Sequence, residues 1–287
     1  MKKQTPDTPH AAHAAVVTGD ESLAREWTAL LEQHDIECIP ARDARALKAA
    51  SSRLTAAYEL TVLPTDEKKE RLRFIDAHLP AHLPIISSSV TVTALAQSQW
   101  IDARERLIGF CGFPTLLGSP LIDISLTPYT TDAVVHQARA CFTAIEKETV
   151  CIQDRTGMIT PGIIAQVINE ALMAVQHNVA SAASIDTAMK LAAGYPFGPI
   201  EWGEKIGFAT IAALLDAMRA ETGEERFRTS QLLRQLAASG KFWSENQLAP
   251  EAPVLVQEEL PLGDAPDPLK PVVRPKKKKA AARATSK

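Results

Sequence analysis

In the first half of the chain, short apolar runs alternate with segments whose apolar residues recur at helical spacing. The apolar run 14–17 has strand length, and segment 21–34 then carries leucines and a tryptophan three and four residues apart, which is the spacing of one helix face. This alternation predicts a mostly parallel α/β sheet with crossover helices. We expect strands at 14–17, 36–39, 60–63, 84–86, 108–110 and 122–126, and helices at 21–34, 43–56 and 65–78.

After Asp154 the pattern changes to amphipathic helices alone. An apolar stripe follows the i, i+3, i+4, i+7 spacing from 163 to 175. Thr160 is its expected N-cap and Pro161 its first helical residue. Two more helices are expected at 184–194 and 208–220, each ended by a nearby glycine. The chain is therefore predicted to hold an α/β N-terminal domain followed by an all-α C-terminal domain.

Composition places the chain among globular proteins. Apolar residues make up 46%, charged residues 23%, and the net charge of −3 indicates no particular partner. No apolar stretch approaches the roughly twenty residues of a membrane span, and the N-terminus has no apolar run of signal-peptide length. The four cysteines form no CxxC pair, so we expect neither a metal site nor a disulfide framework. This cysteine usage fits a reducing cytoplasm, which is the expected location.

Three motifs follow one another in the helical half. They are INEA at 168–171, VASAASIDTAMK at 179–190 and YPFGPIEWG at 195–203. In this order and spacing they resemble the C-terminal domain of the 3-hydroxyacyl-CoA dehydrogenase family, although glycines and prolines that form tight turns also account for the last motif. The resemblance implies an acyl-CoA ligand and a homodimer formed through the helical domain.

The N-terminal half resembles the same family in two places. Segment 107–123 is similar to the family's strand that ends in a catalytic histidine and is followed twelve residues later by a glutamate; these positions hold Cys111 and Asp123. Segment 87–95 is similar to a serine-rich loop, in which Ser88 matches the serine that bonds substrate. The helical hairpin that usually follows the second strand is missing, which implies a shortened Rossmann-like domain.

The turn after the first strand occupies the place of a dinucleotide fingerprint, G-x-G-x-x-G. The three glycine positions hold Gly19, Glu21 and Ala24, and Ala24 is an accepted third residue. Glu21 brings a charge that would cost about 4 kcal/mol at 4 Å from a phosphate in an effective dielectric of 20. Arg42 stands where an acidic residue is expected, so it either favours a 2′-phosphate or is a solvated loop residue. The resemblance implies NAD as cofactor, with NADP as the alternative.

In this family, hydride passes between C3 of the substrate and the nicotinamide while the histidine moves the hydroxyl proton. A thiol has an ordinary pKa near 8.5 and no second nitrogen for a carboxylate to orient. Cys111 is therefore either a thiol base or a small buried residue, and Asp123 either orients or replaces the base. A substrate-binding asparagine of the family aligns with Pro161, which has no side-chain hydrogen-bonding group.

Two functional hypotheses follow. The first is NAD-dependent oxidation of 3-hydroxyacyl-CoA to 3-oxoacyl-CoA in fatty-acid metabolism. The second is a non-catalytic acyl-CoA-binding or subunit-partner protein of the same fold, which Glu21, Cys111 and Pro161 favour. The expected parts are a flexible N-terminus at 1–13, a shortened Rossmann-like domain at 14–152, a helical domain at 153–248 and a disordered Pro-rich, Lys-rich tail at 249–287. Because its lysines lack interleaved aromatic residues, the tail favours a solubilising role over nucleic-acid binding.

Overall fold

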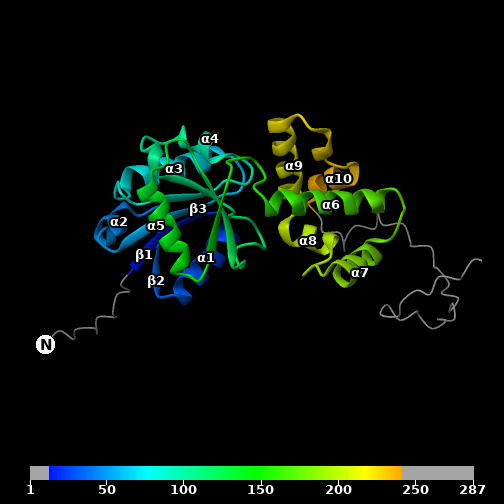
Figure 1. The fold of residues 1–287 in the computed structure, drawn as a ribbon, viewed down its shortest axis with the longest axis horizontal. Coiled ribbons are helices and arrows are strands. Elements are labelled where there is room, and N and C mark those ends of the chain that lie inside the picture. Colours follow the sequence, from blue (N-terminus) through cyan, green and yellow to red (C-terminus); the bar gives the residue numbers. More distant parts are fainter. Residues whose placement is uncertain (1–12, 241–287) are drawn as a thin grey trace, which may run out of the picture. The chain divides into compact units, whose positions relative to one another are not determined.

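A seven-stranded sheet organises the first half of the chain in the computed structural model, which describes residues 13–240 (Figure 1). Its strand order is β2-β1-β3-β4-β5-β6-β7. The first five strands are parallel, β6 runs antiparallel to β5, and β7 is parallel to β6. The strands are β1 (His13–Gly19), β2 (Ile36–Pro40), β3 (Leu54–Leu60), β4 (Ile85–Ser88), β5 (Leu107–Phe110), β6 (Leu121–Leu126) and β7 (Glu148–Ile152).

Helices cover both faces of this sheet because alternate residues of each strand point to opposite sides. Ala15 and Val17 of β1 belong to the same apolar cluster as the buried residues of α1 and α5, whereas Ala14 and Val16 belong to that of α2, α3 and α4. This two-sided burial explains why the strands are continuously apolar. The helices are α1 (Glu21–Gln33), α2 (Ala44–Ala50), α3 (Asp66–His78), α4 (Ala94–Ser98) and α5 (Asp132–Thr143), with a short 3-10 helix η1 (Arg104–Arg106).

The strand order reverses direction between β1 and β3. The chain first moves from β1 outward to β2, and then returns past β1 to form β3 on its other side. In open α/β sheets such a reversal opens a crevice at the carboxyl ends of the strands, where ligands bind. The carboxyl ends of β1 and β3 therefore mark the first place to look for a site.

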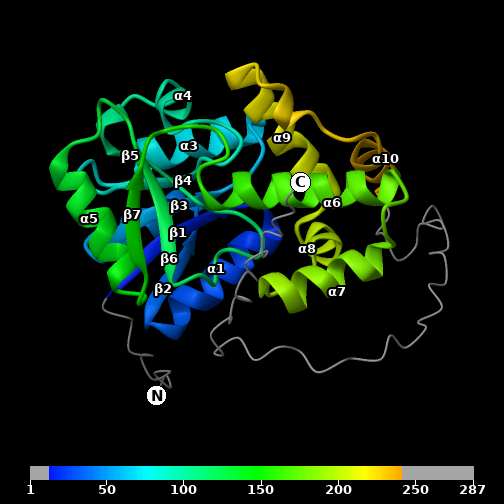
Figure 2. The same cartoon turned by 45° about the vertical axis from the view of Figure 1, so that its right-hand side comes forward.

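The second half of the described chain consists of helices. The long helix α6 packs against α8, α9 and α10 (Figure 2), and its buried residues continue the apolar cluster of the sheet face covered by α1 and α5. The predicted fold class, a Rossmann-like α/β domain followed by an all-α domain, is confirmed. The helices are α6 (Thr160–Gln176), α7 (Ala182–Ala193), α8 (Pro199–Ile206), α9 (Phe208–Thr222) and α10 (Gln231–Ser239), with a 3-10 helix η2 (Glu225–Phe227).

Two predictions around the third strand are wrong. The helix expected to reach residue 56 ends at Ala50, and the strand expected at 60–63 is instead β3, Leu54–Leu60. Alanines in β3 favour helix by intrinsic propensity, but the segment is buried between β1 and β4. Tertiary pairing therefore overrides the local preference.

The boundaries of the C-terminal helices also differ from expectation. Thr160 is the first residue of α6 rather than its N-cap, so Pro161 is the second helical residue, and α7 begins at Ala182 behind Ser181. The glycine-rich motif interpreted as a turn contains helix α8. Gly203 lies within α8. A Cβ at this position would lie 2.6 Å from the ring of Phe208, so the glycine is needed for close packing rather than for a turn.

The predicted tail at 249–287 lies outside the described residues, as do residues 1–12 of the expected flexible N-terminus and residues 241–248 of the expected helical domain. His13 is described and begins β1. Among the residues that the structure describes, no helix has both the length and the apolar character needed to cross a membrane.

Candidate functional site

The turn between β1 and α1 is tight, and it leaves the start of α1 without a side-chain cap. Gly19 has φ of 131°, and a Cβ at this position would lie 2.5 Å from the carbonyl carbon of Leu60 in β3. Only glycine fits there. Asp20, the N-cap residue, does not cap α1 with its side chain, because its carboxylate accepts instead from the amide of Val62 at 3.0 Å. The first amides of α1 thus carry no side-chain cap, and a helix N-terminus of this kind favours anions.

A pocket of about 710 Å³ opens beside this turn. Its lining brings together the four residues that the sequence predicts for cofactor binding, which are Gly19, Glu21, Ala24 and Arg42. The lining also contains Arg25 of α1 and Arg71 of α3, two residues that sequence reasoning missed. We call this the arginine pocket. Its size and its position at the strand-order reversal fit a nucleotide.

The structure reduces the expected repulsion by Glu21. The Glu21 side chain is 88% exposed and forms an ion pair with Arg25 at 2.6 Å. In a water-like dielectric of about 80, a charge 4 Å away costs about 1 kcal/mol instead of the 4 kcal/mol expected for a partly enclosed one. Glu21 therefore does not by itself exclude a pyrophosphate from the turn.

The three residues predicted for catalysis lie together on neighbouring strands. Ser88 ends β4, Cys111 follows β5, and Asp123 belongs to β6, where the amide of Cys111 donates to the carbonyl of Asp123 at 3.0 Å. Because β6 is antiparallel to β5, its early residue Asp123 lies at the carboxyl edge of the parallel strands. We call these three residues the β4–β6 cluster.

Each member of the β4–β6 cluster is buried. Ser88 is 0%, Cys111 4% and Asp123 5% exposed. The hydroxyl of Ser88 donates to the carbonyl of Gly112 at 2.7 Å. Burial raises the pKa of the Cys111 thiol far above its ordinary value, and the negative charge of Asp123 raises it further. Cys111 is thus a neutral thiol at physiological pH and a poor proton acceptor.

The carboxylate of Asp123 joins the sheet to the helical half. Its Oδ2 accepts from the amides of Ile159 and Thr160, at 3.2 and 3.3 Å, at the start of α6. Asp123 therefore supplies the cap that the local sequence of α6 lacks. Both of these hydrogen bonds use Oδ2, so Oδ1 is the oxygen that remains for another partner.

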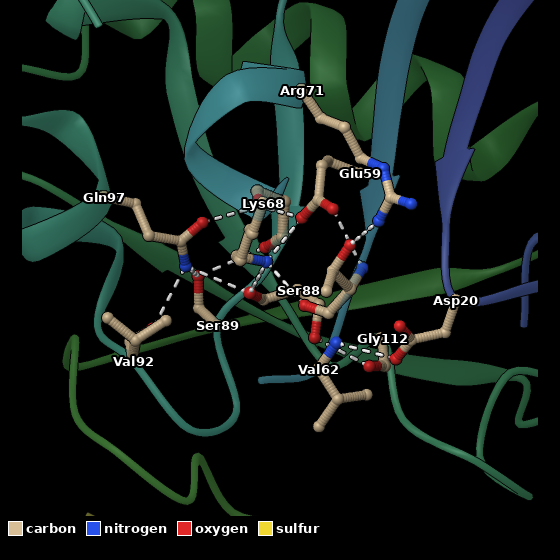
Figure 3. Close-up of polar contacts among 12 residues, drawn as sticks. Asp20, Glu59, Val62, Lys68, Arg71, Ser88, Ser89, Val92, Gln97 and Gly112 are labelled. Carbon is tan, nitrogen blue, oxygen red and sulfur yellow. Dashed lines mark hydrogen bonds and ion pairs between the residues drawn. The ribbon is translucent and has the colours of Figure 1, made fainter. Parts of the chain in front are cut away.

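A fully buried ion pair, Lys68 with Glu59, lies close to Ser88 of the β4–β6 cluster, and Figure 3 shows it together with Arg71 of the arginine pocket. The ammonium of Lys68 in α3 contacts the carboxylate of Glu59 in β3, and it also donates to the carbonyls of Thr61 at 2.6 Å and Ser88 at 3.0 Å. Both side chains of the pair are 0% exposed. Burial lowers the pKa of Lys68.

Two further hydrogen bonds extend this network. The hydroxyl of Ser87 lies 2.6 Å from Oε1 of Gln97 and 3.0 Å from the carboxylate of Glu59, and it can donate its one proton to either oxygen. Sequence reasoning missed Lys68 because it stands in the charged run 66–71, a pattern typical of a solvated helix face. The network fixes the ends of β3 and β4, and hence the edge on which both candidate regions are built.

Among residues 13–240, no group of three or more histidine, cysteine, aspartate or glutamate side chains is arranged to hold a metal ion. Pro161, which aligns with the family's substrate-binding asparagine, is buried at the start of α6. The chemistry available at this edge is therefore that of a carboxylate, a serine hydroxyl, a buried thiol and backbone groups.

Comparison with known proteins gives one family match. The family model of the 3-hydroxyacyl-CoA dehydrogenase C-terminal domain matches residues 157–248. Over 121 residues the chain is 37% identical to the 3-hydroxyadipyl-CoA dehydrogenase of Escherichia coli (strain K12). This alignment covers 42% of this chain and 26% of that protein. Over 139 residues it is 35% identical to the probable 3-hydroxyacyl-CoA dehydrogenase B0272.3 of Caenorhabditis elegans. That alignment covers 48% of this chain and 45% of the relative. The chain thus spans less than half of the length of these two relatives.

The fold is also similar to solved structures. The crystal structure of the (S)-3-hydroxybutyryl-CoA dehydrogenase of Ralstonia eutropha superimposes with a TM-score of 0.64 over 79% of this chain and 86% of that chain, at 19% sequence identity. At this level of identity the likeness concerns the fold alone.

Proposed function

We propose that this protein oxidises 3-hydroxyacyl-CoA to 3-oxoacyl-CoA in fatty-acid or related acyl-CoA metabolism, because residues 157–248 match the C-terminal domain of the 3-hydroxyacyl-CoA dehydrogenases. The residues of the arginine pocket would hold a nicotinamide dinucleotide, which would supply the hydride acceptor; the resemblance implies NAD. The observation that carries the proposal is the position of the arginine pocket and the β4–β6 cluster on the same edge of the sheet.

In this proposal Asp123 takes the hydroxyl proton of the substrate. Cys111 cannot do so, because burial and the neighbouring charge hold its thiol in the neutral form. Asp123 has one oxygen bound by the amides of Ile159 and Thr160, which fixes the orientation of the carboxylate and leaves Oδ1 for the proton. Ser88 would bond the substrate oxygen after its hydroxyl leaves the carbonyl of Gly112.

A second candidate function is acyl-CoA binding without catalysis. It is favoured by the internal use of the β4–β6 cluster, whose hydroxyl and carboxylate already bind backbone groups of the protein. Loss of a positioned base typically slows such a reaction by about 100- to 10,000-fold. A protein of this kind would keep affinity for acyl-CoA and lose turnover.

Calorimetric titration with NADH, NADPH and acetoacetyl-CoA, each alone, separates these functions. An absorbance assay at 340 nm with dinucleotide and acetoacetyl-CoA together then measures turnover. Oxidation of the dinucleotide that is lost in Asp123→Asn and retained in Cys111→Ala supports the dehydrogenase. Binding of acetoacetyl-CoA with no oxidation of either dinucleotide supports the second function and contradicts the first.

We further propose that the protein forms a homodimer through its helical domain. Val179, just before α7, and Leu191, within it, are 74% and 83% exposed, and a second helical domain packed here would cover both side chains. Sedimentation should find a dimer that Leu191→Lys converts to monomer, whereas Leu121→Lys at the exposed start of β6 should not. A monomeric wild type would contradict this proposal.

All four cysteines are free, which supports a reducing compartment such as the cytoplasm.

A further inference from the structure

Three arginines from separate parts of the chain line the arginine pocket. Arg25 comes from the first turns of α1, Arg42 follows β2, and Arg71 comes from α3. The pocket is lined by two carboxylate residues as well, Asp20 and Glu21. Because Arg25, Arg42 and Arg71 come from separate segments of the chain, only the folded structure shows that they line one pocket.

Each lining carboxylate already has a partner. Asp20 accepts from the amide of Val62 at 3.0 Å, and Glu21 pairs with Arg25 at 2.6 Å. The remaining two arginines share one partner outside the lining, Glu67, which contacts Arg71 and lies 3.7 Å from Arg42. Counted with Glu67, the carboxylates here equal the arginines in number, so the net charge is balanced. Glu67 alone serves both Arg42 and Arg71, however, so these two guanidinium groups keep donors for an anion at the end of β2.

Arg42 and Arg71 differ in how firmly they are held. The side chain of Arg42 is 84% exposed and its ion pair is long, so this pair is weak and easily exchanged. Arg71 is only 16% exposed, and its Nη1 donates to the hydroxyl of Thr61 at 2.7 Å. Its Nε is a buried donor with no hydrogen-bond partner in the described structure. A preorganised and a mobile guanidinium together suit a doubly charged oxyanion.

The place of Arg42 in the fold indicates which anion this is. In dinucleotide-binding sheets, the residue that follows the second strand meets the adenosine ribose; an acidic residue there binds the 2′-hydroxyl, whereas an arginine accommodates a 2′-phosphate. Arg42 stands two residues beyond Pro40, where β2 ends. We propose that the arginine pocket selects a dinucleotide with a 2′-phosphate, as in NADP(H), over NAD(H). This inference rests on the proposed function for the presence of a dinucleotide, and it departs from the NAD that the resemblance implies.

The same chemistry, a phosphorylated adenosine ribose, also occurs in CoA, which carries its phosphate at the 3′ position. Both compounds also carry a diphosphate, so the Gly19 turn and the uncapped start of α1 fit either one. The place of Arg42 just beyond β2, where the ribose of a bound dinucleotide lies, favours the dinucleotide. A test must nevertheless separate the two sources. Dephospho-CoA, which lacks the 3′-phosphate, provides the matched comparison.

The experiment is direct binding to the full chain, measured by calorimetry with NADPH, NADH, CoA and dephospho-CoA. We expect NADPH to bind at least about tenfold more tightly than NADH, as expected for charge-assisted hydrogen bonds to a phosphate. Arg42→Ala should weaken NADPH by about tenfold and leave NADH unchanged. The matched control is Arg45→Ala, which removes an exposed arginine of α2 outside the pocket lining.

Equal affinities for NADPH and NADH, or an equal loss of both in Arg42→Ala, would overturn the inference while leaving the dehydrogenase proposal intact. Preference for CoA over dephospho-CoA that depends on Arg42 would overturn it in favour of a CoA site. Tight, Arg42-dependent NADPH binding without any oxidation in the turnover assay supports the inference and contradicts the dehydrogenase instead. Circular dichroism of each variant shows whether the fold is intact before affinities are compared.

Discussion

The arginine pocket and the β4–β6 cluster lie on the same edge of one sheet, yet they are built in opposite ways. The pocket is open, and its charged side chains are exposed or only partly paired. The cluster is closed, and the side chains of Ser88 and Asp123 form hydrogen bonds with backbone groups of the protein. The difference teaches that one edge of a sheet can hold an open, charged pocket beside a closed cluster whose polar groups already bind the protein's own backbone.

The ion pair of Lys68 and Glu59 connects the two regions, so breaking it should have the largest effect. Lys68→Met leaves the Glu59 carboxylate buried and unpaired, because both side chains are 0% exposed. We expect a loss of about 3–5 kcal/mol in the free energy of unfolding, measured by urea denaturation. Replacing both residues together, as Glu59→Gln with Lys68→Met, should cost less. Lys48→Met, at an exposed position of α2, is the control, and an equally small effect of both single changes would mean that the pair does not hold the edge together.

The capping role of Asp123 predicts the next effect. Asp123→Asn keeps a hydrogen-bond acceptor for the amides of Ile159 and Thr160 but removes the charge at the start of α6. We expect a loss of about 1–2 kcal/mol in the free energy of unfolding. Asp35→Asn, at an exposed turn position with φ of 57°, should change stability little. If Asp123→Asn is as stable as the wild type but inactive, the carboxylate serves chemistry rather than the helix.

The buried thiol of Cys111 predicts how stability depends on pH. Its folded-state pKa is raised, so the folded protein keeps the thiol proton that the unfolded chain releases above about pH 8.5. The unfolded state then binds fewer protons, and the free energy of unfolding falls by about 1.4 kcal/mol per pH unit for this group. The loss begins near pH 8.5 and continues as pH rises toward the folded-state value. Urea midpoints at pH 7 to 10 should decline less steeply in Cys111→Ala, and an unchanged slope would show that the thiol already ionises in the folded protein.

Glu21 predicts the smallest effect, because it is exposed and paired with Arg25. Glu21→Gln should raise the affinity for NADPH by less than about fivefold, as is usual for exposed charges. Calorimetry at low and physiological ionic strength measures the change. A gain of a hundredfold would instead mean that Glu21 approaches the pyrophosphate and opposes its binding.

Local signals were sufficient for much of the fold. The spacing of Leu23, Trp27 and Leu31 predicts α1, all three residues are buried in it, and the apolar run that follows is β2. Helices α7 and α9 end at Gly194 and Gly223, both left-handed, as their position in the sequence indicates. Local signals failed at β3, where strand neighbours rather than propensity decide the conformation, and at α6, whose N-terminus is capped by Asp123 from another part of the chain.

The sequence by itself determined the alternation of strands and helices in the first half, the change to helices alone in the second, and the family resemblance of the helical half. It also singled out the candidate residues Gly19, Ser88, Cys111 and Asp123. Only the tertiary structure decided what surrounds them. It buries Lys68 from a charged run beside Glu59, and it brings Arg25, Arg42 and Arg71 into one pocket. The physical reason is that helix and strand periodicity are local properties of the chain, whereas burial, ion pairing and pKa depend on neighbours that the sheet topology brings from distant segments.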